Sequence, residues 1–199
     1  VVPSFPSAPS PSGLAPADGA AALVLQRLDD ARRRGARPLA ALTGFARETL
    51  VTDDFAPCRD PSVVARVVRR ALATCGMTPP RVAAVVLSAS GDPEGDRAEA
   101  TGVAEALGTP VHAVVPALAL GNLFAAAPLT ALAVAAHALA GDGPLAPAVR
   151  SADPIPPCPL ELRAPPDAAD SASLDGAVLA VFAGPGGSVG AFVLERVPP

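Results

Sequence analysis

The chain contains no lysine, tryptophan or tyrosine, and only two histidines and three cysteines. All 15 basic residues are therefore arginines, and the formal net charge at pH 7 is −4. Domains that bind nucleic acid carry a surplus of basic residues, and many add aromatic platforms on which bases stack. Because this sequence has neither, we do not expect it to bind nucleic acid.

Secretion and membrane insertion are not expected either. The first residues lack the charged stretch that opens a secretory signal peptide, and the three cysteines lack the spacing of metal ligands. An odd number of cysteines favours a reducing compartment, so we place the protein in the cytoplasm. Residues 122–140 are nearly apolar and about as long as a membrane span, but Pro128 and His137 interrupt them. We therefore expect a buried core helix there.

Half of the 199 residues are hydrophobic, and most of these are alanine, valine and leucine. A chain of this length can bury one sizeable core, built here from small side chains that let elements approach closely. Residues 1–16 are rich in proline, serine and alanine and are predicted to form an arm or linker, followed by one domain over 17–199. The 25 prolines and many alanines are typical of a GC-rich coding sequence and favour an actinobacterial source.

Apolar strand patterns alternate with helical patterns along this domain. Strands are predicted over 20–28, 38–47, 82–87, 110–115, 177–182 and 189–196. Helices are predicted over 29–35, from the Asp60 cap to Cys75, from the end of an 88–96 loop to Leu107, and from a loop around Gly121 to Leu139. A proline-rich connection covers 141–166. Alternating strands and helices predict an α/β layered fold.

Four short segments carry a recognisable pattern. Residues 88–100 read SASGDPEGDRAEA, and residues 121–129 read GNLFAAAPL. A glycine turn, GPGG, occupies 184–187 before the last predicted strand, and residues 13–25 read GLAPADGAAALVL. In this order and at these separations, the segments resemble the carboxy-terminal half of a β-ketoacyl synthase, which has the thiolase-like layered fold. The resemblance covers about residues 13–197.

The same segments differ from an active synthase at the positions that carry its chemistry. Such enzymes use a cysteine nucleophile to hold the acyl chain and two histidines to drive malonyl decarboxylation. In register with the family, Ser88 replaces the first histidine, Asn122 replaces the second, and Ala117 replaces a lysine. The hydroxyl of serine does not titrate near neutral pH, and asparagine cannot carry a proton. No cysteine stands in a nucleophile context, so the resemblance implies no catalytic residue in this chain.

Residues 96–100 and 121–129 look like the corresponding stretches of chain-length factors, the non-catalytic ketosynthase-β subunits of type II polyketide synthases. The resemblance implies a heterodimer with an active ketosynthase, in which this chain helps to shape the polyketide tunnel and the chain length. The substrate would be carried on the phosphopantetheine of a partner acyl carrier protein, and the chain would hold no cofactor or metal of its own. Leu123, Phe124 and Pro185 are the candidates to line the tunnel, and Pro185 replaces the family's phenylalanine.

Two other functions stay open from the sequence. A ketosynthase-fold acyltransferase or decarboxylase could use altered chemistry, and a purely structural half-domain could stabilise a larger synthase. Members of the family are about twice this length and have two similar halves. A lone half would expose apolar faces, so we expect the chain to be poorly soluble when expressed alone.

Several local patterns have simple structural interpretations. The glycine turn is predicted to be a tight turn and not a phosphate cradle, because it precedes a strand and no helix. The acids from Asp92 to Glu99 are interpreted as a helix start and not as a metal cluster. His112 and His137 are expected to be core residues. Ser88 lies near Asp92 but lacks the nucleophile elbow and the histidine of a serine hydrolase.

Overall fold

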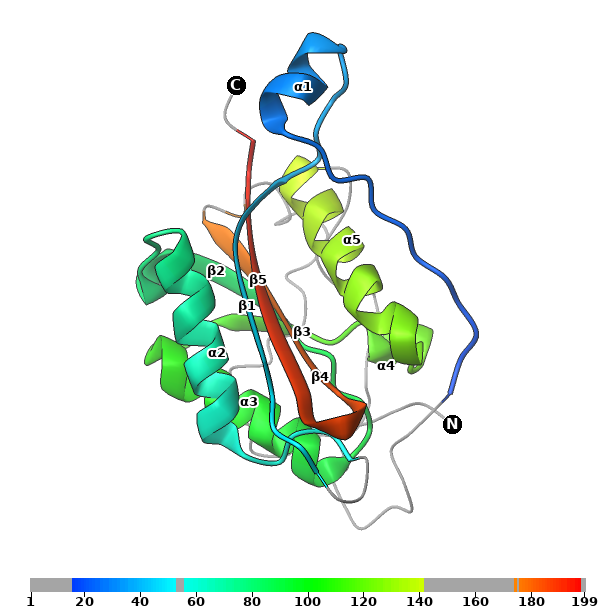
Figure 1. The fold of residues 1–199 in the computed structure, drawn as a ribbon, viewed down its shortest axis with the longest axis vertical. Coiled ribbons are helices and arrows are strands. Elements are labelled where there is room, and N and C mark those ends of the chain that lie inside the picture. The colour runs from blue at the N-terminus through cyan, green and yellow to red at the C-terminus, as the bar shows by residue number, and fades with distance from the viewer. Residues whose placement is uncertain (1–15, 53–55, 142–173, 175, 198–199) are drawn as a thin grey trace.

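The computed structural model describes residues 16–52, 56–141, 174 and 176–197. In this part of the chain, five strands form one mixed sheet in the order β1-β5-β4-β2-β3 (Figure 1). The strands are β1 (Ala41–Thr49), β2 (Val82–Val86), β3 (His112–Val114), β4 (Ala177–Gly184) and β5 (Ser188–Glu195). Strands β2, β3 and β4 are parallel, whereas β5 runs antiparallel to both of its neighbours. The predicted α/β layering is confirmed.

Two helices, α2 (Pro61–Thr74) and α3 (Pro93–Leu107), cover one face of the sheet (Figure 1). Each begins at an aspartate cap followed by proline: Asp60 accepts a hydrogen bond from the Ser62 amide, and Asp92 accepts one from the Gly95 amide, both at 2.8 Å. The start of α2 agrees with the Asp60 cap predicted from the sequence, whereas α3 begins at Pro93, inside the loop predicted over 88–96.

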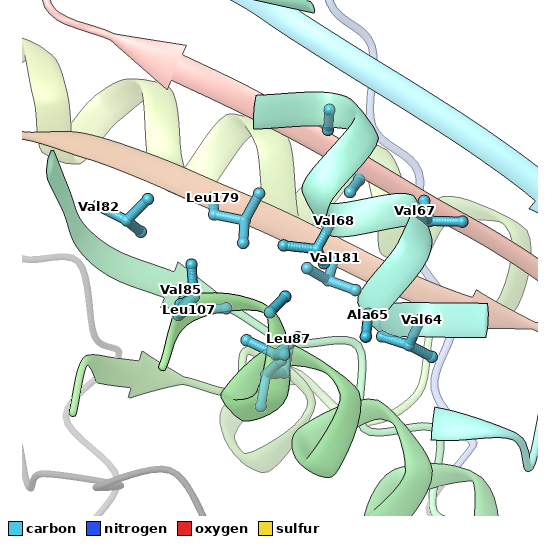
Figure 2. Packing of buried hydrophobic residues seen from close by; sticks show 14 of the residues in the cluster. Val64, Ala65, Val67, Val68, Val82, Val85, Leu87, Leu107, Leu179 and Val181 are labelled. Atoms are coloured by element: carbon cyan, nitrogen blue, oxygen red, sulfur yellow. The ribbon is translucent and has the colours of Figure 1, made fainter. Parts of the chain in front are cut away.

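The core on this face is built from valine and leucine at alternate positions of each strand. Val85 and Leu87 point to it from β2 and the residue after it, and Leu179 and Val181 point to it from β4 (Figure 2). Val64 and its helical neighbours supply the other side. The helices pack closely because Gly102 of α3 lies against α2, where an added Cβ atom would stand 2.4 Å from a backbone oxygen of α2.

The other face of the sheet is covered by α5 (Ala127–Ala140) alone among the described helices (Figure 1). This helix is apolar around most of its circumference, a property of helices that are buried on all sides. Beside it, three phenylalanine rings stack across the sheet: Phe45 of β1 on Phe192 of β5, with centroids 6.3 Å apart, and Phe182 of β4 on Phe192, 6.1 Å apart. Phe45 is exposed, so this face is only partly covered.

The predicted strand over 20–28 is wrong. Residues 20–27 form neither strand nor helix, and α1 (Leu28–Arg33) begins where that strand was expected to end. Val24 and Leu25 are 87% and 73% exposed. A strand needs a partner to satisfy its backbone groups, and the described sheet consists of β1–β5 only. The apolar run therefore has strand composition but pairs with neither edge strand of the described sheet, β1 or β3.

The remaining differences are smaller. The strand predicted over 38–47 begins three residues later, at Ala41, and the long apolar helix begins only at Ala127, after the short helix α4 (Ala117–Leu120) and a 3₁₀ turn (Phe124–Ala126). His137 is exposed near the end of α5 and is not a core residue. The predicted arm over 1–16 lies outside the described residues except for Pro16, and the 141–166 connection lies outside them except for Gly141.

Candidate functional site

The candidate site lies where the parallel strands end. Strands β2, β3 and β4 run in the same direction, so their carboxyl ends and the loops that follow them meet at one edge of the sheet. In open α/β sheets this edge is the usual place for a ligand site. A small hollow there is lined by Ser88, Ala117, Asn122 and Leu123, together with apolar neighbours such as Leu120. The fold thus brings together four of the six residues selected from the sequence.

Ser88 is held in place by hydrogen bonds on both sides of its hydroxyl. Its Oγ donates to Glu99 Oε1 at 2.8 Å and accepts from the Ala183 amide at 3.1 Å. The hydroxyl thereby joins the loop after β2, helix α3 and the end of β4. A hydroxyl committed to a carboxylate and a backbone amide has a structural role already, and no histidine is among the residues that line the hollow.

Two buried carboxylates one helical turn apart on α3 hold the 88–91 loop. Glu99, which is 1% exposed, also accepts hydrogen bonds from the amides of Ser88 and Ala89 at 3.0 Å each. Asp96 accepts from the Ser90 hydroxyl at 3.2 Å and from the Gly91 amide at 3.0 Å. Burial raises the pKa of Glu99 to about 7 and the pKa of Asp96 to about 6.

The interpretation of the acidic run as a helix start is confirmed, because α3 begins at Pro93 and carries Glu94 and Asp96 in its first turn. Asp92 caps the helix and forms an ion pair with Arg59 at 3.2 Å, while Asp96 and Glu99 are in addition buried supports of the loop. The sequence carried one signal that could have revealed them. Both acids fall on the face of α3 that also bears Val103 and Ala100, so a helical projection places them toward the core.

Asn122 connects three segments of the chain. Its side-chain Nδ2 donates to the Ser90 carbonyl at 2.6 Å, its Oδ1 accepts from the Phe124 amide at 2.8 Å, and its own carbonyl accepts from the Ala17 amide at 3.0 Å. The side chain therefore ties the loop after β2 to the turn that leads into α5.

Phe124 and Pro185 are placed differently from the other four selected residues. Both are exposed, and neither lines the hollow. Pro185 opens a tight 3₁₀ turn over Pro185–Gly187, in agreement with the predicted turn. The turn is fixed by backbone hydrogen bonds at 3.0 Å from the Gly187 amide to the Ala56 carbonyl and from the Leu50 amide to the Gly187 carbonyl. Gly187 has a φ of +73°, and a Cβ atom there would overlap the Leu50 carbonyl.

The cysteines and histidines do not assemble into a second site within the described residues. Cys58 is buried in a loop and Cys75 lies at the end of α2, as expected, while Cys158 lies outside the described residues. His112 is half-buried on β3. In the part of the chain that the structure describes, no three ligand-type side chains come close enough to hold a metal ion.

Comparison with known proteins gives the family. The family model described as the C-terminal domain of beta-ketoacyl synthase matches residues 40–148, which is more than half of the chain. This chain belongs to the β-ketoacyl synthase family. The family resemblance read from the 88–100 and 121–129 segments is confirmed.

One curated relative of this β-ketoacyl synthase domain comes from Streptomyces coelicolor and is named as a polyketide beta-ketoacyl synthase 2. It is 38% identical over 130 residues, which make up 64% of this chain and 30% of that protein. The chain thus spans about a third of the length of this relative.

Solved structures agree with the assigned fold. The ishigamide ketosynthase/chain length factor matches with a TM-score of 0.71 at 20% identity, covering 86% of this chain and 41% of that chain. A type II polyketide synthase acyl carrier protein in complex with its ketosynthase bound to the hexaketide matches with a TM-score of 0.68 at 19% identity, covering 86% and 42%. The predicted thiolase-like fold, limited to a carboxy-terminal half, is confirmed.

The lengths of the described helices were compared with the length that a membrane span needs. Among the described helices, none has both the length and the apolar character that a membrane span needs. The longest apolar helix, α5, has 14 residues and packs on the sheet.

Proposed function

We propose that this chain is the carboxy-terminal part of a non-catalytic ketosynthase-like subunit of the chain-length-factor type. It pairs in the cytoplasm with an active ketosynthase and helps to shape the tunnel in which a polyketide grows. The growing chain is bound to the partner's cysteine, and extender units arrive on the phosphopantetheine of an acyl carrier protein. This subunit contributes walls to the tunnel and no reacting group.

The observation that carries the proposal is the state of the two positions where the family has histidines. Ser88 and Asn122 lie around one hollow, which supports the assignment of both residues to one former site. Yet the Ser88 hydroxyl is bonded to Glu99 and to the Ala183 amide, and the Asn122 amide is bonded to Ser90 and Phe124. Neither side chain titrates near neutral pH, and Glu99, whose pKa lies near 7, is buried behind Ser88 and does not line the hollow. Neither of these two positions therefore presents an acid or base for decarboxylation to the hollow.

A partner is supported by the apolar face on the α5 side of the sheet. Helix α5 contains no aspartate, glutamate or arginine, and the stacked rings of Phe45, Phe192 and Phe182 continue the apolar surface beside it. Exposed apolar area of this kind is a feature of surfaces that are covered by another protein part. The relatives named above supply the type of partner, since one solved match is a ketosynthase/chain length factor and another contains an acyl carrier protein.

The test is a reconstitution. The chain is co-purified with an active ketosynthase-α subunit, and the pair receives malonyl-loaded acyl carrier protein. We expect polyketide from the pair, no CO₂ release from the chain alone, and no product when the partner's nucleophilic cysteine is replaced by alanine. Turnover of malonyl-carrier protein by the isolated chain would overturn the proposal and favour an enzyme with altered chemistry.

The lengths of the polyketide products distinguish a tunnel-shaping subunit from a purely structural half-domain. Two matched variants are compared. Phe124→Ala removes an exposed ring from the 121–129 segment, which follows the edge strand β3, and Phe45→Ala removes an exposed ring from β1, the edge strand on the other side of the sheet. A tunnel-shaping subunit changes the distribution of product lengths in Phe124→Ala. If both variants lower the yield and leave the length distribution unchanged, the subunit is a structural support only.

A further inference from the structure

The strongest unassigned feature is the backbone of Phe124. Its φ is +48°, a left-handed conformation that bulky side chains rarely adopt. Such strain persists only where the surrounding structure holds it, and it concentrates at functional sites. The Phe124 side chain is 53% exposed, so the buried core does not impose this conformation.

The group that holds it is the side chain of Asn122. Its Oδ1 accepts from the Phe124 amide two residues on, which is the Asx-turn geometry that stabilises unusual backbone conformations. Its Nδ2 donates to the Ser90 carbonyl at 2.6 Å, so the turn is anchored to the loop after β2. That loop is itself held by the buried carboxylates Asp96 and Glu99.

A second segment fastens the same turn from outside. The Ala17 amide donates to the Asn122 carbonyl, and Pro16 forms a parallel bridge with Asn122. Gly19 then passes so close to Leu123 that an added Cβ atom would stand 2.7 Å from a Leu123 methyl group. The turn over 121–124 is therefore clamped between the 88–91 loop and residues 16–19, with Asn122 bonded to both.

The chemistry of an amide side chain is suited to this position. It offers a donor and an acceptor a fixed distance apart, and both are used here. Alanine offers neither, and aspartate keeps the acceptor but loses the donor. Asn122 thus has a positive structural role at a place where the family resemblance predicts a catalytic histidine.

We infer that Asn122 is a positioning residue: it sets the left-handed turn at Phe124 and so fixes the direction in which the phenylalanine ring leaves the site. This rests on the proposed function, in which the ring of Phe124 bounds the growing polyketide. A histidine at this position would react with the substrate. Asn122 instead orients Phe124, a residue of the tunnel wall, toward the substrate.

The first experiment is independent of the proposed function. Hydrogen exchange of the Phe124 amide is followed in the purified full chain as wild type, Asn122→Ala and Asn122→Asp. Loss of one hydrogen bond speeds exchange by roughly tenfold, and we expect this acceleration in Asn122→Ala and not in Asn122→Asp. Equal exchange rates in wild type and Asn122→Ala would overturn the positioning role, and thermal unfolding of each variant checks that it is folded.

The second experiment links the turn to the product. In the reconstituted synthase with malonyl-loaded acyl carrier protein, Asn122→Ala should shift the distribution of product lengths in the same direction as Phe124→Ala, while Asn122→Asp keeps the wild-type distribution. A shift in Phe124→Ala with none in Asn122→Ala would refute the inference. If wild type gives polyketide and Phe124→Ala leaves its length unchanged, the link to the product is refuted. If wild type gives no polyketide with its partner, the proposed function fails while the exchange result still decides the turn.

Discussion

Replacing Glu99 by glutamine tests the account of the site most directly, because this side chain is a carboxylate in the core. Glu99 is 1% exposed, and it accepts hydrogen bonds from the Ser88 amide, the Ser88 hydroxyl and the Ala89 amide. The charged neighbour that acts on it is a second acid, Asp96. Ala89 has a φ of +40°, so Glu99 also holds a strained backbone position.

The sign of the pH dependence follows from the direction of the shift. Burial raises the pKa of Glu99 from an ordinary value near 4.5 to about 7, so between these values the folded chain binds a proton that the unfolded chain has released. The free energy of unfolding must therefore fall as pH rises through this window, which is opposite to the behaviour of a salt-bridged carboxylate. A difference of one pKa unit corresponds to 1.36 kcal/mol, so the full effect is about 3 kcal/mol at most.

Asp96 adds to the effect in the same direction. Burial raises its pKa from 3.8 to about 6, which places its window below that of Glu99. Between pH 5.5 and pH 8, Glu99 changes its charge in the folded state more completely than Asp96 does. A stability difference over this range therefore reports mainly on Glu99.

The assay is urea unfolding at pH 5.5 and pH 8.0. Wild type should be more stable at pH 5.5 by about 1–3 kcal/mol, and Glu99→Gln should lose most of this difference because a neutral amide does not titrate. The matched control is Glu94→Gln, an exposed acid on the same helix, which should keep the wild-type slope. If wild type is equally stable at both pH values, or if Glu99→Gln keeps the full pH dependence, the assignment of Glu99 as a buried carboxylate with a raised pKa is refuted.

Four further substitutions test the local geometry. Ser88→Ala leaves the Ala183 amide without its acceptor and should lower the free energy of unfolding by about 1–2 kcal/mol, as measured by urea unfolding; a neutral result would contradict a structural role for the hydroxyl. Gly102→Ala should lower the free energy of unfolding by about 1–3 kcal/mol, because the added methyl group overpacks α2 on α3. Gly108→Ala should lower it by about 1–2 kcal/mol for a different reason, since the space there is open but φ is +64°. Equal melting temperatures for wild type and Gly102→Ala would refute the close packing. Asp60→Ala removes the cap of α2 and should cost about 1 kcal/mol; loss of helix signal without loss of stability is not expected.

Local chemistry explains why much of the fold could be predicted. Asp60 and Asp92, each followed by proline, mark the starts of α2 and α3 through contacts only two or three residues long. Gly108 ends α3 in the left-handed conformation, and the glycine turn at 184–187 joins β4 to β5. Each of these signals depends on neighbours in sequence, so it is visible before any tertiary structure is known.

The incorrect predictions concern residues whose state depends on distant partners. The run from 20 to 27 has the composition of a strand, but a strand needs a neighbouring strand, and this run pairs with neither edge strand of the described sheet. For Asp96 and Glu99 the sequence predicted only a helix start, and their role as buried acceptors depends on donors from the loop after β2. The start of the apolar helix was placed too early because the turn at Asn122 is made by contacts to Ser90 and Ala17.

The sequence alone determined the family and the α/β alternation, since these depend on residue types and their spacing, and the resemblance implied that Ser88 and Asn122 stand where the family has histidines. Only the tertiary structure decided what the exchanged residues do. Hydrogen bonds join Ser88 to Glu99 and to Ala183, which is 95 residues away, and join Asn122 to Ser90 across 32 residues. These residues come together because the carboxyl ends of the parallel strands β2, β3 and β4 lie at the same end of the sheet. No local sequence pattern encodes that arrangement.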